Sequence, residues 1–317
     1  MGQVTGYFTH KDCWRHEMGP GHPECPARLD AIEDRLLASG LAPFLERREA
    51  TPAAMADLEL AHGRMHLAAL RGLSDQLRDD IAAGGPSHAQ IDPDTSINVH
   101  TWDAVLVSAG AAIDAVDAVM AGELANAFCA TRPPGHHATR HQAMGFCFVN
   151  NVAVGARYAL ERHGLERVAI IDFDVHHGNG TEDIVAGDER ILMCSFYQHP
   201  FYPPWDHAQA PNLVNLPVPA YTKGMEVREL VDMMWLPRLD AHRPQMVFVS
   251  AGFDAHREDD MGQLALVEND YAWITERIKE VAKRHAQGRI VSCLEGGYDL
   301  SSLARSVEAH LRVLADL

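Results

Sequence analysis

Apolar residues recur along the chain in two patterns, one typical of helices and the other of buried strands. Helical spacing predicts helices over 26–37, 103–121, 150–163, 226–242 and 268–286, and a last one that begins at Ser301. Pro26 suits a first helical turn and Gly40 a helix stop, whereas Pro237 interrupts the helix over 226–242.

Short apolar runs of strand length lie between these helices. They cover 127–131, 168–171, 191–195, 246–250 and 290–294, and each is followed by glycine, proline or polar residues. Strands that alternate with helices indicate βαβ units and a mostly parallel sheet, which predicts the α/β class. Because the runs are apolar on both faces, we expect helices on both sides of the sheet.

The composition is that of an ordinary globular protein. The 317 residues are 47% hydrophobic and 22% charged, and no apolar run is long enough for a membrane span. The N-terminal residues lack the basic and apolar regions of a secretion signal, so we expect a cytoplasmic protein with no membrane partner. This length is compatible with one domain or two.

Charge and cysteine usage narrow the choice of partner. The net charge of −17 disfavours binding to nucleic acid, since an acidic surface repels phosphates. It would attract cationic substrates such as lysine-bearing peptides or polyamines, although acidic charge also simply keeps a protein soluble. The six cysteines show no CxxC spacing, so we expect free thiols. Assembly into a homo-oligomer is left open.

Residues with catalytic chemistry cluster just past four of the predicted strands. The segments are RPPGHH at 132–137, DFDVHHGNG at 172–180, SAGFDAH at 250–256 and EGGY at 295–298. In parallel α/β sheets the ligand site lies outside the carboxyl ends of the strands. We therefore expect the four segments to bring histidine, aspartate and tyrosine side chains to one crevice.

Three of these side chains form a candidate metal site. Asp174 and His176 are two residues apart, so at an extended strand end they project to the same side. Asp254 follows another apolar strand and supplies a third ligand. Three protein ligands leave a position for water or substrate, as catalytic zinc requires, and iron(II) also suits this ligand set. Taken singly, an aspartate after a strand is often only a helix cap.

The remaining residues suit acid–base chemistry beside such a metal. His136 and His137 follow a rigid Pro-Pro-Gly turn, and proton transfer is their best use once three ligands are assigned. Asp172 would orient a histidine and raise its basicity, and Asn179 could do so more weakly. Tyr298 could donate a hydrogen bond to a developing oxyanion, although in isolation packing on the sheet end would be the preferred interpretation.

Together these motifs resemble the histone deacetylase and acetylpolyamine amidohydrolase family. RPPGHH, GFCFVNN at 145–151, DFDVHHGNGT, SAGFDAH and EGGYDL occur in this order, and the opening HEMGPGHPECPARL is also similar to the family. The resemblance covers nearly the whole chain. It implies one arginase-like α/β domain over 1–317, with a central eight-stranded parallel sheet flanked by helices.

The resemblance also implies roles for individual residues. The zinc ligands would be Asp174, His176 and Asp254. The catalytic residues would be His136 with its partner Asp172, His137 with its partner Asn179, and Tyr298. An asparagine at position 179 resembles the class II branch. A structural potassium ion would be bound through oxygens of Asp172, Asp174, His176, Ser195 and Phe196.

For the substrate, the resemblance implies an acyl-lysine tunnel. Gly145 and Phe146 would form one wall, with Tyr202 or Phe201 opposite. Arg28 would lie near an exit for acetate, although in isolation it would be interpreted as a surface charge on a helix. Met261 would lie at the tunnel mouth, where an apolar residue resembles the protein deacetylases and a glutamate would suit a polyamine.

The implied activity is zinc-dependent removal of acetyl or other acyl groups from an amine, above all acyl-lysine or a related small amide. Deacetylation of acetylpolyamines is the alternative. An arginase-type enzyme would need a two-manganese carboxylate set that these motifs lack. A non-catalytic acyl-binding protein would not need Tyr298 and the histidine pair.

Overall fold

Eight parallel strands form the central sheet of the molecule. The computed structural model describes residues 4–206 and 208–317. The strands are β1 (Thr5–Thr9), β2 (Leu45–Glu49), β5 (Asn126–Cys129), β6 (Val168–Asp172), β7 (Ile191–Gln198), β8 (Leu213–Val218), β9 (Val247–Ala251) and β10 (Ile290–Leu294). Their order is β2-β1-β5-β10-β9-β6-β7-β8. This confirms the expected eight-stranded parallel sheet.

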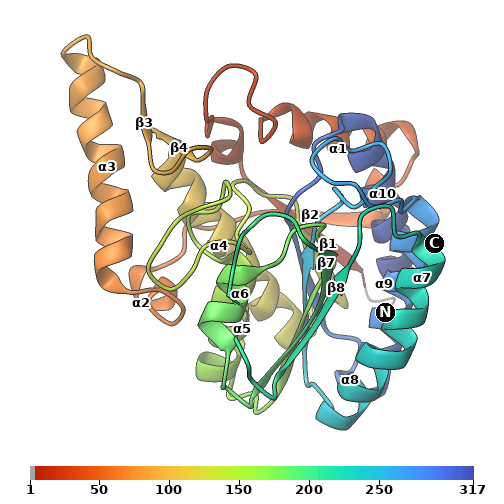
Figure 1. Ribbon diagram of the computed structural model, residues 1–317. Coiled ribbons are helices and arrows are strands. Elements are labelled where there is room, and N and C mark those ends of the chain that lie inside the picture. The colour runs from red at the N-terminus through yellow and green to blue at the C-terminus, as the bar shows by residue number, and fades with distance from the viewer. Residues whose placement is uncertain (1–3, 207) are drawn as a thin grey trace.

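Helices cover both faces of this sheet (Figure 1). One face packs against α4 (Thr101–Met120) and α5 (Asn151–His163), and α3 (Arg64–Ala82) packs on α4 farther from the sheet. The other packs against α1 (Ala27–Ala38), α7 (Gly224–Leu230), α8 (Leu236–His242), α9 (Glu268–His285) and α10 (Leu300–Leu314). The remaining elements are short: α2 (Met55–Leu58), α6 (Asn179–Val185), the 3₁₀ turns Lys11–Trp14 and Ala42–Phe44, and an antiparallel pair, β3 (His88–Gln90) and β4 (Ser96–Asn98).

The strand β6 shows why the central strands are continuously apolar. Val168 and Ile170 belong to the core on the α4 and α5 side. Ala169 and Ile171 belong to the core on the α9 and α10 side. Successive side chains of a strand point to opposite faces, so a strand covered on both faces needs apolar residues at every position.

Three strands of the central sheet were not predicted from the apolar pattern: β1, β2 and β8. The strands β2 and β8 lie at the two edges of the sheet. The sequence of β2 is LERRE, and β8 contains Pro217, which cannot donate a ladder hydrogen bond. Charged residues and proline are typical of edge strands because they prevent pairing with other chains. These same residues hide edge strands from a search for apolar runs.

The helix predicted over 226–242 is divided, as Pro237 suggested. A π-helical turn at Val231–Trp235 separates α7 from α8. Pro237 follows the π-helical turn directly, and because it lacks an N–H and its ring crowds the preceding turn, it interrupts the regular α-helical ladder there. The Trp235 ring is buried and stacks on Phe196, with 5.8 Å between ring centroids. The interruption therefore precedes the proline.

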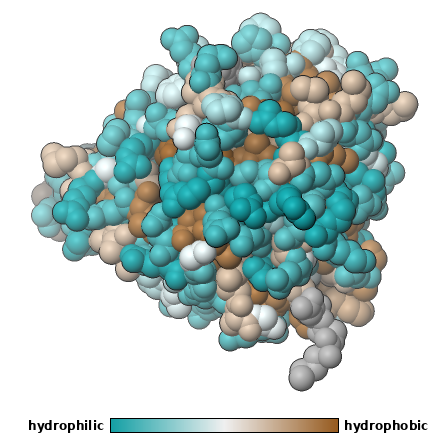
Figure 2. Space-filling view, turned by 90° about the horizontal axis from the view of Figure 1, so that it is seen from below, coloured by the Kyte–Doolittle hydropathy of each residue, from teal (hydrophilic) through white to brown (hydrophobic). Residues whose placement is uncertain are grey.

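The molecular surface is mainly hydrophilic, as expected from the share of charged residues in the sequence. Figure 2 shows a face on which hydrophilic residues predominate and apolar residues appear in small patches between them. In the described part of the chain, no helix combines the length and the apolar character needed to cross a bilayer. All six cysteines are free, as expected, and five of them are buried.

Gly110 allows α4 to approach the loop after β2. A Cβ atom at this position would lie 1.7 Å from the carbonyl oxygen of Thr51. We expect Gly110→Ala to lower the free energy of unfolding by about 1–3 kcal/mol, because the overpacked helix must shift away. Urea unfolding followed by circular dichroism measures this change.

Gly72, on the exposed side of α3, is the matched control. No atom lies within 4 Å of a Cβ built there. Gly72→Ala should leave stability unchanged or raise it by up to about 1 kcal/mol, since alanine favours helix. Equal effects of the two substitutions would contradict the packing role of Gly110.

Candidate metal centre and active site

Side chains with catalytic chemistry meet at the carboxyl ends of four adjacent strands. The strands β5, β10, β9 and β6 are neighbours in the sheet. The segments that follow them carry His136, His137, Tyr298, Asp254, Asp174 and His176. Residues that are far apart in sequence therefore meet in one crevice, as the strand-end pattern predicted.

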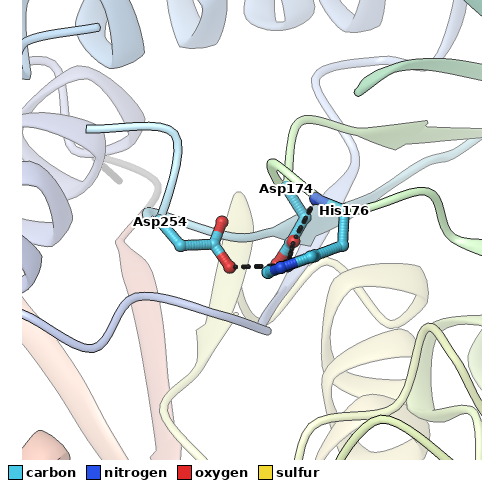
Figure 3. Close-up of side chains that lie close together, drawn as sticks. All are labelled: Asp174, His176 and Asp254. Atoms are coloured by element: carbon cyan, nitrogen blue, oxygen red, sulfur yellow. Dashed lines mark hydrogen bonds and ion pairs between the residues drawn. The ribbon is translucent and has the colours of Figure 1, made fainter. Parts of the chain in front are cut away.

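Asp174, His176 and Asp254 form a compact, buried triad (Figure 3). The Nδ1 atom of His176 lies 3.1 Å from Oδ1 of Asp174 and 3.2 Å from Oδ2 of Asp254. One potential ligand atom from each residue falls within 4.8 Å of the other two. In the figure the two carboxylates approach the imidazole from different loops. Two oxygen ligands and one nitrogen ligand suit zinc or another divalent transition metal.

Backbone donors bind the carboxylate oxygens that lie outside this cluster. The N–H of Gly296 donates to Oδ2 of Asp174 at 2.9 Å, and the N–H of Val175 donates to Oδ1 of Asp254 at 2.9 Å. Oδ2 of Asp254 is buried, receives no backbone hydrogen bond among the described residues, and faces Nδ1 of His176 at 3.2 Å. A buried carboxylate oxygen with so little stabilisation is costly, and a cation would satisfy it.

The charges of the triad also favour a cation. Burial and the negative charge of Asp174 raise the pKa of Asp254 to about 7. Burial alone would lower the pKa of His176, but hydrogen bonds to Asp174 and Asp254 raise it to about 10. A proton on His176 offsets only part of the negative charge of the two carboxylates. A divalent cation would displace this proton and neutralise both carboxylates.

The two adjacent histidines have different partners. Nδ1 of His136 lies 3.0 Å from Oδ2 of Asp172, and Nδ1 of His137 lies 2.7 Å from Oδ1 of Asn179. The two ring centroids are 4.0 Å apart. One imidazole therefore faces a carboxylate and the other a neutral amide.

These partners give the two histidines opposite protonation tendencies. For His136, burial acts against the charged form, but the charges of Asp174 and Asp172 outweigh it and raise the pKa well above its usual value. For His137, burial and the neighbouring imidazoles of His136 and His176 lower the pKa well below its usual value. His136 is thus suited to remain a cation, and His137 to remain neutral with a free ring nitrogen.

Glycines let the loops approach the metal ligands closely. A Cβ atom at Gly252 would lie 2.0 Å from Oδ2 of Asp174, and one at Gly296 would lie 2.0 Å from Oδ2 of Asp254. No larger residue fits at either position without moving a ligand. This is a physical reason for glycine in the SAGFDAH and EGGY segments.

A cavity of about 250 Å³ opens above the triad. Its lining includes His137, His176 and Tyr298 from the catalytic cluster. The walls and mouth are formed by Gly145, Phe146, Phe201, Tyr202, Met261, Asp94 and Asp260. Phe201 stacks on His176 at 5.5 Å, and Tyr202 meets the His137 ring edge-on at 5.3 Å. Of the five residues predicted to contact substrate, four line this cavity and Arg28 does not.

Arg28 lies beneath the tyrosine loop instead. It is fully buried, so its interpretation as a surface charge is wrong. Its Nε donates to the carbonyl oxygen of Gly297 at 2.6 Å, and Nη2 donates to that of Glu295 at 2.5 Å. The guanidinium carbon lies 5.0 Å from the centroid of the Tyr298 ring. Arg28 therefore supports the backbone that carries Tyr298.

The Tyr298 phenol stays protonated in this environment. Burial and the charge of Asp254 raise its pKa well above the usual value, against the opposing effect of Arg28. Its ring also meets Phe146 edge-on, with centroids 5.8 Å apart. A protonated hydroxyl that lines the cavity can donate a hydrogen bond to an oxygen in the cavity.

The residues of the implied potassium site lie on two paired strands. Asp172 pairs directly with Ser195 in the register of β6 and β7. Asp174 and His176 follow β6, and Phe196 follows Ser195 within β7. The Ser195 hydroxyl donates to Oδ1 of Asn215 at 2.9 Å. The set is thus local to the strands beneath the triad.

Glu295 has a structural role that sequence reasoning did not assign. Its Oε2 accepts hydrogen bonds from the backbone N–H groups of Gly135 at 2.6 Å and His136 at 3.1 Å. Its Oε1 accepts one from the Ser250 hydroxyl at 3.1 Å. Glu295 opens the EGGY segment, but a glutamate before two glycines does not by itself indicate these partners. It fixes the turn that presents the two histidines.

Asp94 and Asp260, at the cavity mouth, were also missed. Acidic loop residues usually belong to a solvated surface, so only the fold distinguishes these two from the many others.

Sequence comparison places this site among known enzymes. The sequence model described as the histone deacetylase domain matches residues 22–314. A histone deacetylase-like amidohydrolase of Pseudomonas aeruginosa is 36% identical over 324 residues, which cover 94% of this chain and 82% of that protein. A probable deacetylase of Archaeoglobus fulgidus is 36% identical over 308 residues, with the same two coverages.

A solved structure is similar over almost the full length. The crystal structure of the HDA15 HD domain matches with a TM-score of 0.91 and 30% sequence identity. The match covers 99% of this chain and 90% of that one. The similarity therefore includes the strands and loops that form the crevice.

Removal of one triad carboxylate tests the metal centre. We expect Asp254→Ala to reduce bound zinc from about one ion per chain to nearly none, because two ligands cannot complete the site. Elemental analysis of the dialysed protein measures the zinc content. The control is Asp260→Ala. Asp260 is an exposed acidic residue of the same loop and lies outside the triad, so this variant should keep its zinc. Stoichiometric zinc in Asp254→Ala would refute this ligand.

Proposed function

The chain belongs to the histone deacetylase family and is a deacetylase, and we propose that it removes acyl groups from acylated lysine or a related small amide. The observation that carries this proposal is the convergence of three groups on one cavity. These are the buried Asp174–His176–Asp254 triad, the unequal histidine pair and Tyr298. We further propose that residues 1–317 form a single catalytic domain, and that the cofactor is zinc.

Zinc bound by the triad would polarise the acyl carbonyl and lower the pKa of the attacking water. His137 is the general base. Its Nδ1 faces Asn179, which leaves Nε2 to accept the proton of the water as the oxygen attacks the carbonyl carbon. His137 returns this proton to the amine nitrogen as the C–N bond breaks. The second proton of the water also ends on this nitrogen, so the products are a carboxylate and an ammonium ion.

Tyr298 and His136 stabilise the negative charge that develops on the carbonyl oxygen. The Tyr298 hydroxyl donates a hydrogen bond to this oxygen. His136, held by Asp172, remains protonated and supplies a fixed positive charge beside the reacting centre. Its charge next to His137 also favours the return of the proton from His137 to the amine nitrogen.

The cavity supports a linear, partly apolar substrate. Phe146 and Tyr202 contribute aromatic surface to its walls, and Met261 contributes a flexible apolar side chain at its mouth. Such walls suit the methylene chain of a lysine and exclude water from the carbonyl. Gly145 adds no side chain and lies directly against the His137 ring.

A potassium ion is the second proposed cofactor. Oxygens of Asp172, Asp174, His176, Ser195 and Phe196 would bind it beneath the triad. The register pairing of Asp172 with Ser195 supports this set. Phe196 has no side-chain oxygen, so it would contribute its backbone carbonyl, while its ring packs on Trp235.

Deacetylation of acetylpolyamines is the second candidate function. Asp94 and Asp260 place two carboxylates at the cavity mouth, where a cationic amine of the substrate could bind. Met261 favours the first candidate, since it adds no third charge. An acylated amine is the partner under either proposal.

A direct assay separates these candidates. The purified protein should release acetate from a fluorogenic acetyl-lysine peptide, and a chelator should abolish the activity until zinc is restored. Acetylated polyamines, tested in parallel, should be poorer substrates. Activity that is insensitive to the chelator would contradict the metal-dependent mechanism, and a preference for polyamines would favour the second candidate.

Removal of one hydroxyl tests the mechanism. Tyr298→Phe should lower kcat by about 100-fold to 1,000-fold, because a donor to the oxyanion is lost. Zinc content should not change, since Tyr298 is outside the triad. Tyr221→Phe, which removes the hydroxyl of an exposed tyrosine, is the control. Full turnover in Tyr298→Phe would refute this role.

A further inference from the structure

The backbone segment before Tyr298 is too flexible by itself to hold the tyrosine in one position. Two glycines precede it, and Gly297 has a φ of +119°, a conformation that L side chains rarely adopt. The Tyr298 hydroxyl accepts or donates no hydrogen bond within the described residues, so it does not anchor the ring. The ring depends instead on its own backbone and on contacts with Phe146 and Arg28.

Neighbouring groups hold the residues just before the tyrosine. Arg28 donates to the carbonyl oxygens of Glu295 and Gly297. The N–H of Phe253 donates to the carbonyl oxygen of Gly296 at 2.9 Å. These bonds fix the segment up to Gly297. The backbone N–H of Tyr298 still needs a hydrogen-bond acceptor.

Asp259 accepts that hydrogen bond. It lies in the loop after β9, between the triad residue Asp254 and the mouth residue Met261, and only 4% of its surface is exposed. Its Oδ2 accepts from the N–H of Tyr298 at 2.6 Å and from the N–H of Asp299 at 2.9 Å. Its Oδ1 accepts from the N–H of Met261 at 2.9 Å.

One carboxylate thus joins two loops that line the same cavity. Hydrogen bonds from N–H groups to a buried carboxylate are short, strong and directional. Three such bonds leave Asp259 little freedom to move. The backbone of Tyr298 is therefore fixed relative to the β9 loop, which also carries the triad residue Asp254.

We propose that Asp259 is a positioning residue for catalysis, which holds Tyr298 at the distance and angle needed to donate to the oxyanion. This inference rests on the proposed role of Tyr298. It assigns no contact between Asp259 and the substrate. Asp259 would therefore affect turnover only by changing the position of Tyr298.

A purely structural role is the competing explanation. Asp259 could matter only because it stabilises the start of α10. However, Asp299 is already the N-cap of that helix and accepts from the N–H of Ser302 at 2.8 Å. The two explanations differ in one measurable respect, since only the positioning role requires the effect of Asp259 to depend on the Tyr298 hydroxyl.

A double-mutant cycle measures this dependence. In the wild-type background, Asp259→Ala should lower kcat on the acetyl-lysine peptide by about tenfold to 100-fold, the range expected for a misplaced catalytic group. In the Tyr298→Phe background, the same substitution should change kcat by less than about twofold. Zinc content should stay at the wild-type value in all four proteins.

A conservative variant and a matched control complete the design. Asp259→Asn retains one oxygen for the N–H groups of Tyr298 and Asp299, so it should recover part of the lost turnover. It also replaces Asp259→Ala in the cycle if the alanine variant does not fold. Asp270→Ala removes another buried carboxylate, which accepts from a backbone N–H at the start of α9. It should lower the melting temperature without lowering kcat.

The outcomes are distinct. An equal loss of kcat from Asp259→Ala in both backgrounds, or no loss in the wild-type background, would overturn the inference but not the proposed function. A loss of zinc in Asp259→Ala would also overturn it, because the residue would then act through the metal loop. Wild-type turnover in Tyr298→Phe would refute the proposed role of the tyrosine and, with it, this inference.

Discussion

Buried carboxylates at the carboxyl end of the sheet must find hydrogen-bond donors, and the loop geometry of the site depends on how they do so. Asp174, Asp254, Asp259 and Glu295 all accept hydrogen bonds from backbone N–H groups. In each case at least one donor belongs to a loop after a different strand. A charge left buried without such partners would be strongly destabilising. Satisfying the carboxylates therefore ties together the loops after β5, β6, β9 and β10, which surround the triad and line much of the cavity.

The glycines of the motifs follow from the same constraint. A backbone N–H can reach a buried carboxylate only if no side chain intervenes, and a Cβ at Gly252 or Gly296 would collide with Asp174 or Asp254. Glycine permits this approach, but it also leaves the loop with more conformations to lose on folding. The hydrogen bonds from these loops to the carboxylates compensate for this loss of conformational entropy. The same hydrogen bonds therefore bring the loops close to the carboxylates and hold them there.

The fold gives the two adjacent histidines, His136 and His137, different protonation tendencies although their side chains are identical. Both imidazoles are buried and lie in contact, so a charge on one opposes a charge on the other. The carboxylate of Asp172 places the charge on His136, whereas Asn179 offers His137 an acceptor without charge. The proposed base and the proposed electrostatic group are therefore assigned by their partners. Neither role is a property of the histidines alone.

The sequence alone predicted the α/β class, five of the central strands and the candidate triad, because apolar runs and the polar residues that follow them can be recognised locally. Apolar runs mark buried strands, and the parallel arrangement brings the residues after them to one edge. The edge strands β2 and β8 were not predicted, because the charged residues and the proline that protect an edge strand also interrupt its apolar pattern. The partners of Arg28 and Asp259 were decided only by the tertiary structure, since Arg28 is 269 residues from Gly297 and Asp259 is 39 residues from Tyr298. A side chain shows its chemistry in the sequence, but a backbone N–H is the same at almost every position. Which carboxylate it satisfies is settled only when the chain folds.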